Sequence, residues 1–143
     1  MRYALDVQYR GKNYAGSQIQ FEDGKQIDEP TIQGELERAI STLIICGKHA
    51  AENKQDRQVK TIFSGRTDKG VNALGQVVHF DTDKEIVASD FIYHINEILP
   101  EDISVNNLRI VPDSFHAQKS AKSRYYKYEL INRRYKQAFD GDI

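Results

Sequence analysis

The sequence predicts an α+β fold in which two helices pack against one face of a sheet. Two observations support this prediction. Apolar residues alternate with polar ones along several short segments, as in half-buried strands, and recur at helical spacing along two longer segments. These segments follow one another as strand, helix, strand, strand, helix, strand, with one additional strand after them. At 143 residues, the chain is long enough for one domain with a substantial core.

The first third of the chain is predicted to contain a strand, a loop and a helix. Tyr3 to Tyr9 alternates apolar and polar side chains and predicts the strand, and the glycine-punctuated residues 10–18 predict the loop. Thr31 suits the N-cap of a helix whose apolar positions are Ile32, Leu36, Ala39, Ile40, Leu43 and Ile44. We expect this helix to end at Gly47 and the polar residues 48–58 to form a loop.

Two further strands and a second helix are predicted next. Val59 to Phe63 forms the second strand, and Gln76 to Asp81 forms the third, with Val77 and His79 on one face and the residues that follow each of them on the other. Ser89 and Asp90 can start the second helix, which Pro100 ends.

The last part of the chain is predicted to contain two strands. Ile103 to Val111 forms the fourth strand, and Arg124 to Ile131 forms a fifth. In the fifth strand, Tyr126, Tyr128 and Leu130 share one face.

The first six elements match the ferredoxin-like βαββαβ arrangement, which RRM-like modules share. Such a sheet carries its helices on one face and leaves the other open, and RNA-binding modules use that open face. Because many functions share this fold, the arrangement by itself identifies none of them.

Composition indicates an ordinary soluble globular protein with a formal net charge of −1. The single cysteine, Cys46, excludes an internal disulfide and a cysteine-based metal cluster, and its apolar neighbours predict a buried, unreactive thiol. No apolar stretch is long enough to span a bilayer, and no signal-peptide pattern opens the chain. We therefore expect a cytoplasmic protein that does not bind membranes.

Charge is distributed unevenly along the chain. Nearly every charge from Asp81 to Asp102 is negative, whereas nearly every charge from Lys119 to Lys136 is positive. The basic segment also contains Tyr125, Tyr126, Tyr128 and Tyr135. Aromatic faces between cations suit stacked bases and phosphates, so this segment favours nucleic-acid binding over a simply solvated strand.

The segment SGRTDKG, residues 64–70, is the main candidate for chemistry. Its glycines have the spacing of a phosphate-binding loop, but Val71 and Asn72 stand where that motif needs Lys and then Ser or Thr. His79 and Asp81 share a strand face and could belong to a hydrolytic metal site, yet such sites usually need three or four ligands. No nucleophile-elbow motif occurs either.

Asp68 remains as a lone carboxylate in this segment, with two interpretations open. It could act as a nucleophile, since covalent catalysis by aspartate is established chemistry, and Arg66 would favour its ionised form. It could instead close a turn by accepting hydrogen bonds from nearby backbone amides, and the residues by themselves favour this interpretation.

Several ordered blocks, together covering nearly the whole chain, resemble TruA-type tRNA pseudouridine synthases. The blocks are residues 9–20 (YRGKNYAGSQIQ), 31–37 (TIQGELE), 65–80 (GRTDKGVNALGQVVHF), 96–103 (NEILPEDI), 115–118 (FHAQ) and 120–128 (SAKSRYYKY). The resemblance implies an isomerase, an intramolecular transferase, that converts uridines of the tRNA anticodon stem-loop to pseudouridine without a cofactor or metal. It also implies a homodimer for the full-length enzyme.

The same resemblance implies roles for individual residues. Asp68 matches the catalytic aspartate, which forms a covalent adduct, and Arg66 matches an arginine that orients it and helps the base leave the stack. Tyr126 matches the tyrosine that stacks on the target base, and Arg124 supports the same pocket. We also expect His116, in the FHAQ block, to bind substrate.

The chain departs from the family pattern at four positions. Lys69 replaces a small residue and could add a phosphate contact, and Asn72 replaces a common His. Gln118 replaces a common Arg, which could weaken RNA binding, and Ser17 replaces a common aromatic residue.

Length is the larger departure. Family members continue into a second, similarly folded half, so residues 1–143 are interpreted as the N-terminal subdomain. The alternative to an enzyme is therefore an RNA-binding half-domain that is catalytically inactive by itself.

Overall fold

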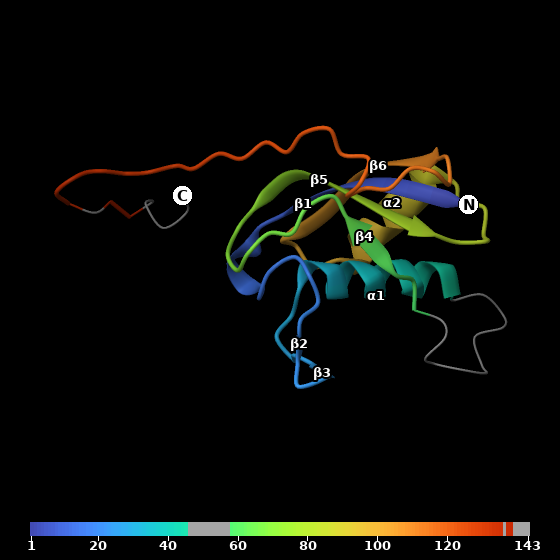
Figure 1. Ribbon diagram of the computed structural model, residues 1–143, viewed down its shortest axis with the longest axis horizontal. Helices are drawn as coiled ribbons and strands as arrows, with labels where there is room; N and C mark the ends of the chain where they lie inside the picture. Colours follow the sequence, from blue (N-terminus) through green and yellow to red (C-terminus); the bar gives the residue numbers. More distant parts are fainter. Residues whose placement is uncertain (46–57, 136, 139–143) are drawn as a thin grey trace.

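The computed structural model describes residues 1–45, 58–135 and 137–138. Two helices, one short 3₁₀ turn (Gly11–Asn13) and six strands occur in this part of the chain (Figure 1). The helices are α1 (Ile32–Ile45) and α2 (Ala88–Ile98), and the strands are β1 (Arg2–Tyr9), β2 (Phe21–Glu22), β3 (Lys25–Gln26), β4 (Thr61–Phe63), β5 (Ala73–Asp81) and β6 (Ile103–Val111).

Four strands form one antiparallel sheet with the order β4-β5-β1-β6, which confirms the predicted α+β class. The central strand β1 pairs with β5 on one side and β6 on the other. Arg2 lies opposite Asp81 and Tyr9 lies opposite Ala73, so β5 begins at the end of the sheet where β1 finishes. The segment that connects β4 to β5 therefore lies at that end.

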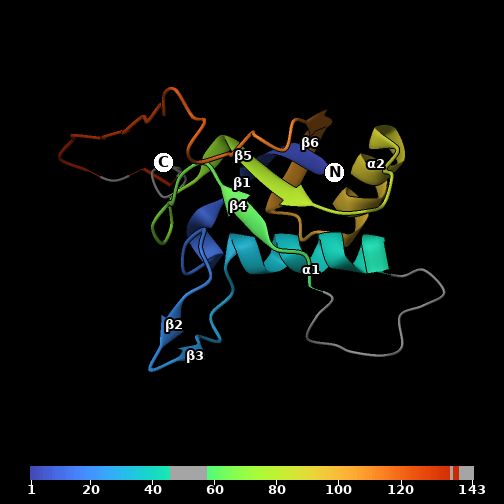
Figure 2. The ribbon, with the colours of Figure 1, turned by 45° about the vertical axis from the view of Figure 1, so that its right-hand side comes forward.

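The core lies between the sheet and the two helices, which share one face of it (Figure 2). Alternate β1 side chains, from Tyr3 to Tyr9, point into this core and are at most 3% exposed. They pack with β5, α1 and α2 through a fully buried set that includes Leu36, Ile40, Val78, Phe80 and Ile95. The predicted strand alternation is thus confirmed, because a period of two places every second side chain on the helical face.

Helix boundaries follow partly from the predicted signals. The Thr31 hydroxyl accepts a hydrogen bond from the Gly34 amide at 3.0 Å, which confirms Thr31 as the cap of α1. By contrast, α2 begins after Val87, and Ser89 lies inside the helix without acting as its cap. Leu99 terminates α2 directly before Pro100, as predicted.

The small hairpin of β2 and β3 was not predicted, although its signal is present in the sequence. Asp23 and Gly24 connect the two strands with φ angles of 50° and 77°. An Asp-Gly pair with positive φ at both positions is typical of the tight turn in two-residue hairpins. The hairpin projects from the body beside α1 (Figure 1).

The predicted fifth strand is wrong. Residues 121–133 have no strand pairing in the structure, and Figure 1 shows them leaving the sheet as an extended segment. We call residues 124–135 the tail; Tyr125 and Leu130 in it are 98% and 92% exposed. Alternating side chains indicate an extended backbone, but a strand also needs a hydrogen-bonding neighbour, and no described strand lies beside the tail.

Some sequence-based expectations fall outside the described residues. These are the buried thiol of Cys46, the helix end at Gly47, most of the predicted loop at residues 48–58, and Lys136. No helix among the described residues is long and apolar enough to cross a membrane.

Candidate active site

The SGRTDKG segment, extended to residue 72, connects β4 to β5 at the end of the sheet where β1 finishes. We call residues 64–72 the site loop. Its backbone bonds extensively to buried polar side chains, whereas Arg66 and Asp68 within it are exposed. The backbone of the loop is thus fixed by hydrogen bonds, whereas the charged side chains of Arg66 and Asp68 are exposed.

Gln76 on β5 holds the first part of the site loop. Its carboxamide is 7% exposed and accepts hydrogen bonds from the Ser64 hydroxyl at 2.5 Å and the Gly65 amide at 3.2 Å. It also donates to the Gly65 carbonyl at 2.8 Å and to the Tyr9 hydroxyl at 3.3 Å. The side-chain amide therefore pairs with both polar groups of the Gly65 backbone, as a neighbouring strand would.

Thr67, in the middle of the site loop, is held from two sides. The Tyr9 hydroxyl shares a 2.7 Å hydrogen bond with the Thr67 hydroxyl. From the other side, the buried Ser17 donates its amide to the Thr67 carbonyl at 3.0 Å and accepts the Thr67 amide on its hydroxyl at 2.8 Å. Thr67 directly precedes Asp68, so these contacts fix the backbone from which the Asp68 side chain projects.

The last part of the site loop is a tight turn that packs on residues 10–14. The Val71 amide donates to the Asp68 carbonyl at 3.2 Å, and Gly70 has a φ of 82°, which side-chain-bearing residues rarely adopt. A Cβ on Gly11 would lie 2.1 Å from the Val71 carbonyl oxygen, so only glycine allows the two backbones to approach this closely. The Gly11 amide also donates to the Asn72 side chain at 2.8 Å.

The predicted catalytic side chains remain available to a ligand. Among the described residues, the Asp68 carboxylate forms no hydrogen bond or ion pair, so it does not close a turn through its side chain. Arg66 lines a hollow of about 140 Å³, together with Ser17, Gln18, Gln33, Thr61, Ile62, Phe63 and Gln118. Lys69 lies 4.0 Å from Glu29 in an exposed ion pair, a geometry that contributes little to stability.

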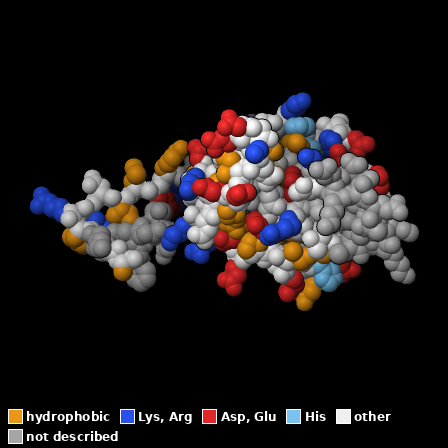
Figure 3. Space-filling model, turned by 90° about the horizontal axis from the view of Figure 1, so that it is seen from below, with side chains coloured by type: hydrophobic (Ala, Val, Ile, Leu, Met, Phe, Trp, Pro, Cys, Tyr) orange, Lys and Arg blue, Asp and Glu red, His pale blue; other side chains and the backbone are white. Residues whose placement is uncertain are grey.

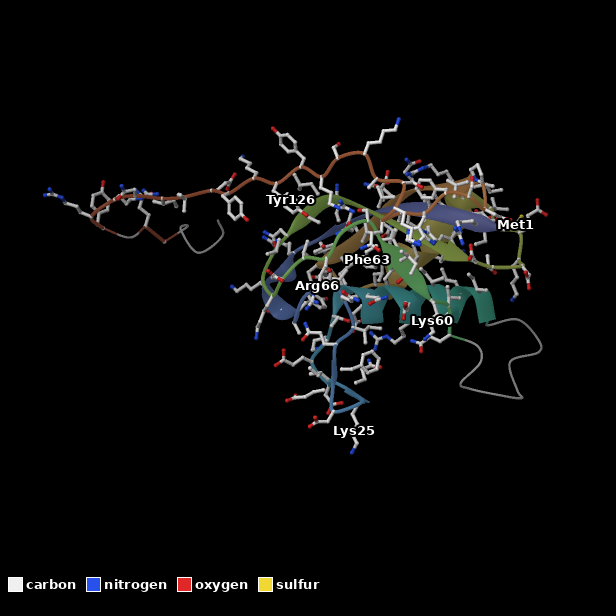
Figure 4. The ribbon with its side chains drawn as sticks, in the orientation of Figure 1. Met1, Lys25, Lys60, Phe63, Arg66 and Tyr126 are labelled. Atoms are coloured by element: carbon white, nitrogen blue, oxygen red, sulfur yellow. The ribbon has the colours of Figure 1, made fainter. Side chains whose placement is uncertain are left out.

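Arg124 and Tyr126 approach the same loop from the beginning of the tail. The Arg124 guanidinium donates two hydrogen bonds to the Ser64 carbonyl, at 2.9 and 2.6 Å, and one to the Gln118 carbonyl at 3.3 Å. A Cβ on Gly65 would lie 3.7 Å from the Tyr126 hydroxyl. Figure 4 shows Arg66 and Tyr126 at the end of the sheet opposite Met1.

Although Arg124 is bonded to the body, other cations lie at the outer end of the tail, beyond the body of the molecule (Figure 3). Figure 3, which views the molecule from the side of α1 and the hairpin, shows cations at the outer end of the tail, whereas the body carries both signs of charge. Tyr128 is 89% exposed. The expected mixture of cations and aromatic rings is therefore accessible to a partner.

His116 is oriented toward the protein backbone. Its Nδ1 accepts hydrogen bonds from the Gln118 and Lys119 amides at 3.2 and 3.0 Å, and its ring packs edge-on against His79 with centroids 5.0 Å apart. The contacts of His116 shape the turn at residues 116–120, which places Gln118 beside the hollow.

His79 and Asp81 are both engaged with other groups. His79 is 3% exposed, and its Nδ1 accepts the Ala117 amide at 2.9 Å; burial, with Arg2 and His116 nearby, lowers its pKa. Asp81 forms an ion pair with Arg2 at 2.8 Å, which lowers the pKa of its carboxyl. In residues 1–45, 58–135 and 137–138, no group of three or more His, Cys, Asp or Glu side chains could hold a metal ion.

Sequence reasoning missed the residues that hold the site loop. In the sequence, Ser17 is a departure from the family pattern, and Tyr9 and Gln76 fall in predicted strands and resembling blocks, but none of the three was assigned a role in holding this loop. A buried polar residue on the core side of a predicted strand, such as Gln76, was a usable signal because buried polar groups need partners.

Comparison with known proteins identifies relatives for this arrangement. No protein-family model matches the chain. The chain is 38% identical over 133 residues to tRNA pseudouridine synthase A of Colwellia psychrerythraea, and 44% identical over 130 residues to that of Polynucleobacter asymbioticus. It is 37% identical over 139 residues to that of Bacillus subtilis.

The chain is homologous to tRNA pseudouridine synthase A. The matches include 93%, 91% and 97% of this chain but only 45%, 43% and 50% of the respective relatives. The chain thus spans about half the length of these synthases.

Proposed function

We propose that this chain is the catalytic half of a tRNA pseudouridine synthase, with Asp68 as its nucleophile. One observation carries the proposal: the Asp68 carboxylate is exposed and unpaired among the described residues, on a loop whose backbone is held by Ser17 and Gln76 and whose Thr67 hydroxyl is held by Tyr9. A nucleophilic side chain needs a rigid backbone beneath it and a reactive atom that no other group occupies. Homology to tRNA pseudouridine synthase A indicates the class of reaction.

The proposed reaction is an isomerisation in which the uracil base is detached from its ribose and rejoined through a carbon atom. Asp68 forms a covalent adduct while the base is detached and is released when the new bond forms. The bond from the ribose to the ring nitrogen breaks and a bond to a ring carbon forms; that carbon loses a proton and the nitrogen gains one, so no atom is gained or lost overall. In this proposal the reaction proceeds without cofactor or metal. Arg66 lines the hollow and has no hydrogen-bonding or ionic partner among the described residues, so it does not contact Asp68 in this structure. We propose that Arg66 orients Asp68 and helps the base leave the stack once RNA is bound.

Binding is assigned to the tail and its neighbours. Extruding a base costs a few kcal/mol, and stacking on an aromatic ring such as Tyr126 recovers about 1–3 kcal/mol. Arg124 supports this pocket by holding the start of the tail on Ser64. Lys69 and His116 complete the proposed substrate-binding set, with Lys69 contacting phosphate.

The wider proposal concerns the whole protein. The sheet order β4-β5-β1-β6 and the helices on one face support a ferredoxin-like, RRM-like arrangement as one half of a synthase fold. The substrate would be the anticodon stem-loop of tRNA, and the full-length enzyme would be a cytoplasmic homodimer. An exposed tail without a neighbouring strand is consistent with a site that a second half completes.

A second candidate function, RNA binding without catalysis, is supported by the fact that the chain spans only about half the length of its relatives. Because the chain spans about half of its relatives, it could bind RNA by itself without modifying it. The exposed tyrosines and cations of the tail suit such binding.

Pseudouridine mapping on bulk tRNA tests both functions. The chain is assayed alone and joined to the half of the Bacillus subtilis relative that the match leaves out. Asp68→Ala should abolish pseudouridine formation while tRNA binding persists, and Asp83→Ala, at another exposed aspartate, should leave both unchanged. If Asp68→Ala forms pseudouridine as fast as the unchanged protein, Asp68 is not the nucleophile. If the chain binds tRNA but makes no pseudouridine, either alone or joined to the second half, the RNA-binding function is the one supported.

A further inference from the structure

We propose that Ser17 is a positioning residue: its hydroxyl fixes the Thr67 peptide, and thereby the direction of the Asp68 side chain. The catalytic part of this inference rests on the proposed function. Nothing in the homology assigns the role, because the resemblance leads us to expect an aromatic ring at this position in place of the small hydroxyl that accepts the Thr67 amide here.

The contacts between Ser17 and Thr67 are reciprocal. The Ser17 amide donates to the Thr67 carbonyl at 3.0 Å, and the Ser17 hydroxyl accepts from the Thr67 amide at 2.8 Å. Ser17 is 1% exposed, so water does not readily replace its hydroxyl. Both polar groups of the Thr67 backbone are therefore fixed by one residue, directly before Asp68.

Ser17 is itself attached to a rigid element. Its carbonyl accepts the Gln33 amide at 2.9 Å, and the Gly16 carbonyl accepts the Ile32 amide at 3.2 Å. These two amides belong to the first turn of α1, where helical amides have no partner within the helix. Residues 16 and 17 thus connect the N-terminus of α1 to the site loop.

Close backbone packing strengthens this connection. Gly16 has a φ of 133°, and a Cβ built on it would lie 3.1 Å from the Thr67 carbonyl oxygen. The peptide before Ser17 therefore lies directly against the site loop. A small shift in Ser17 is transmitted to Thr67 because little space separates the two segments.

The expected consequence is selective. Catalytic groups lose rate steeply when displaced, and a displacement of about 1 Å can cost roughly a hundredfold. Binding of tRNA depends mainly on cations and aromatic rings elsewhere, so it should change little. Loss of the Ser17 hydroxyl should therefore lower kcat by about tenfold to a hundredfold and change KM by less than about threefold.

The experiment compares Ser17→Ala, Ser17→Cys and Ser41→Ala. Ser17→Cys retains nearly the same volume but offers sulfur, a weaker acceptor, and it guards against misfolding of the alanine variant. Ser41 provides the matched control because its hydroxyl accepts the Val59 amide at 3.0 Å, away from the site loop. Amide exchange of Thr67 and the carboxyl carbon signal of Asp68 are measured by NMR, without any need for activity.

Both Ser17 variants should accelerate Thr67 exchange by at least about fivefold and shift the Asp68 signal, whereas Ser41→Ala should do neither. Kinetics are then measured in the form of the protein that makes pseudouridine. Unchanged Thr67 exchange, an unchanged kcat, or an equal response to Ser41→Ala would overturn the inference. If no form makes pseudouridine, the proposed function fails, and the NMR measurements alone decide whether Ser17 holds the loop.

Discussion

Arg124 donates two hydrogen bonds to the Ser64 carbonyl oxygen, at 2.9 and 2.6 Å, and thereby joins the start of the tail to the start of the site loop. Sixty positions separate these residues in the sequence. Arg124 therefore anchors one segment to the other. Any contact between its guanidinium and RNA would form while the guanidinium is bonded to the Ser64 carbonyl. The Tyr126 hydroxyl also lies near Gly65, at 3.7 Å from where a Cβ on that residue would be.

Gly65→Ala should disturb this anchor. A Cβ at position 65 would lie 3.1 Å from Nε and 3.2 Å from Cδ of Arg124, which is tighter than an ordinary contact. We expect a loss of about 1 kcal/mol or less in unfolding free energy, because Arg124 is exposed and can move. The Nε–H signal of Arg124 in an NMR spectrum should lose its protection from exchange.

Gly75→Ala is the matched control. Nothing lies within 4 Å of a Cβ at position 75, so this variant should keep the Arg124 signal unchanged. An unchanged Arg124 signal in Gly65→Ala would show that the anchor tolerates a side chain and would contradict the expected crowding.

Acidification should destabilise the protein through His79. Burial, together with Arg2 and His116, lowers the pKa of His79 below its ordinary value of 6.5, and protonation of Nδ1 would break the hydrogen bond from Ala117. The unfolded chain therefore binds the proton more readily, so this contribution is present above pH 6.5 and is lost as pH falls through the lower, folded-state pKa. Urea midpoints measured between pH 7.5 and about 5 should decrease.

His79→Gln should flatten this part of the pH profile, because glutamine keeps an acceptor and does not titrate. His94→Gln, at an exposed position on α2, should retain the wild-type slope. Equal slopes in wild type and His79→Gln would assign the acid sensitivity to another group.

Glu37 should have the opposite pH dependence. It is 3% exposed, and burial raises the pKa of its carboxyl above the ordinary value of 4.5, although the Thr61 amide and hydroxyl donate to it at 2.8 and 3.1 Å. A raised pKa contributes stability below pH 4.5 that is lost as pH rises through the folded-state pKa. Wild type should therefore lose stability as the pH rises from 4.5 to 7.5, whereas Glu37→Gln should not, so the free energy of unfolding of the variant should rise relative to that of wild type across this range.

Urea titration of both proteins at several pH values measures this difference. Glu97→Gln, at an exposed position on α2, serves as the control and should run parallel to wild type. A constant difference between wild type and Glu37→Gln across the range would show that the Glu37 proton is not linked to folding.

The sequence predicted the elements whose signals are local. The alternation in β1, the Thr31 cap and the Leu99–Pro100 helix end were predicted correctly, since each depends on a few neighbouring residues. The fifth strand was wrong because its pattern describes the backbone of the tail and cannot supply a neighbouring strand. The Asp23-Gly24 hairpin shows that a local signal can also be overlooked.

The sequence by itself determined the order of the two helices and the four strands of the main sheet and, through its resemblance to a known family, the candidate residues Asp68, Arg66 and Tyr126. Only the tertiary structure decided how the site loop is held. The Ser17 hydroxyl meets the Thr67 amide across 50 positions, and the Gln76 amide meets the Tyr9 hydroxyl across 67. Periodicity reports which face of an element is buried, but partners for buried polar groups are set by which segments the folded chain brings into contact.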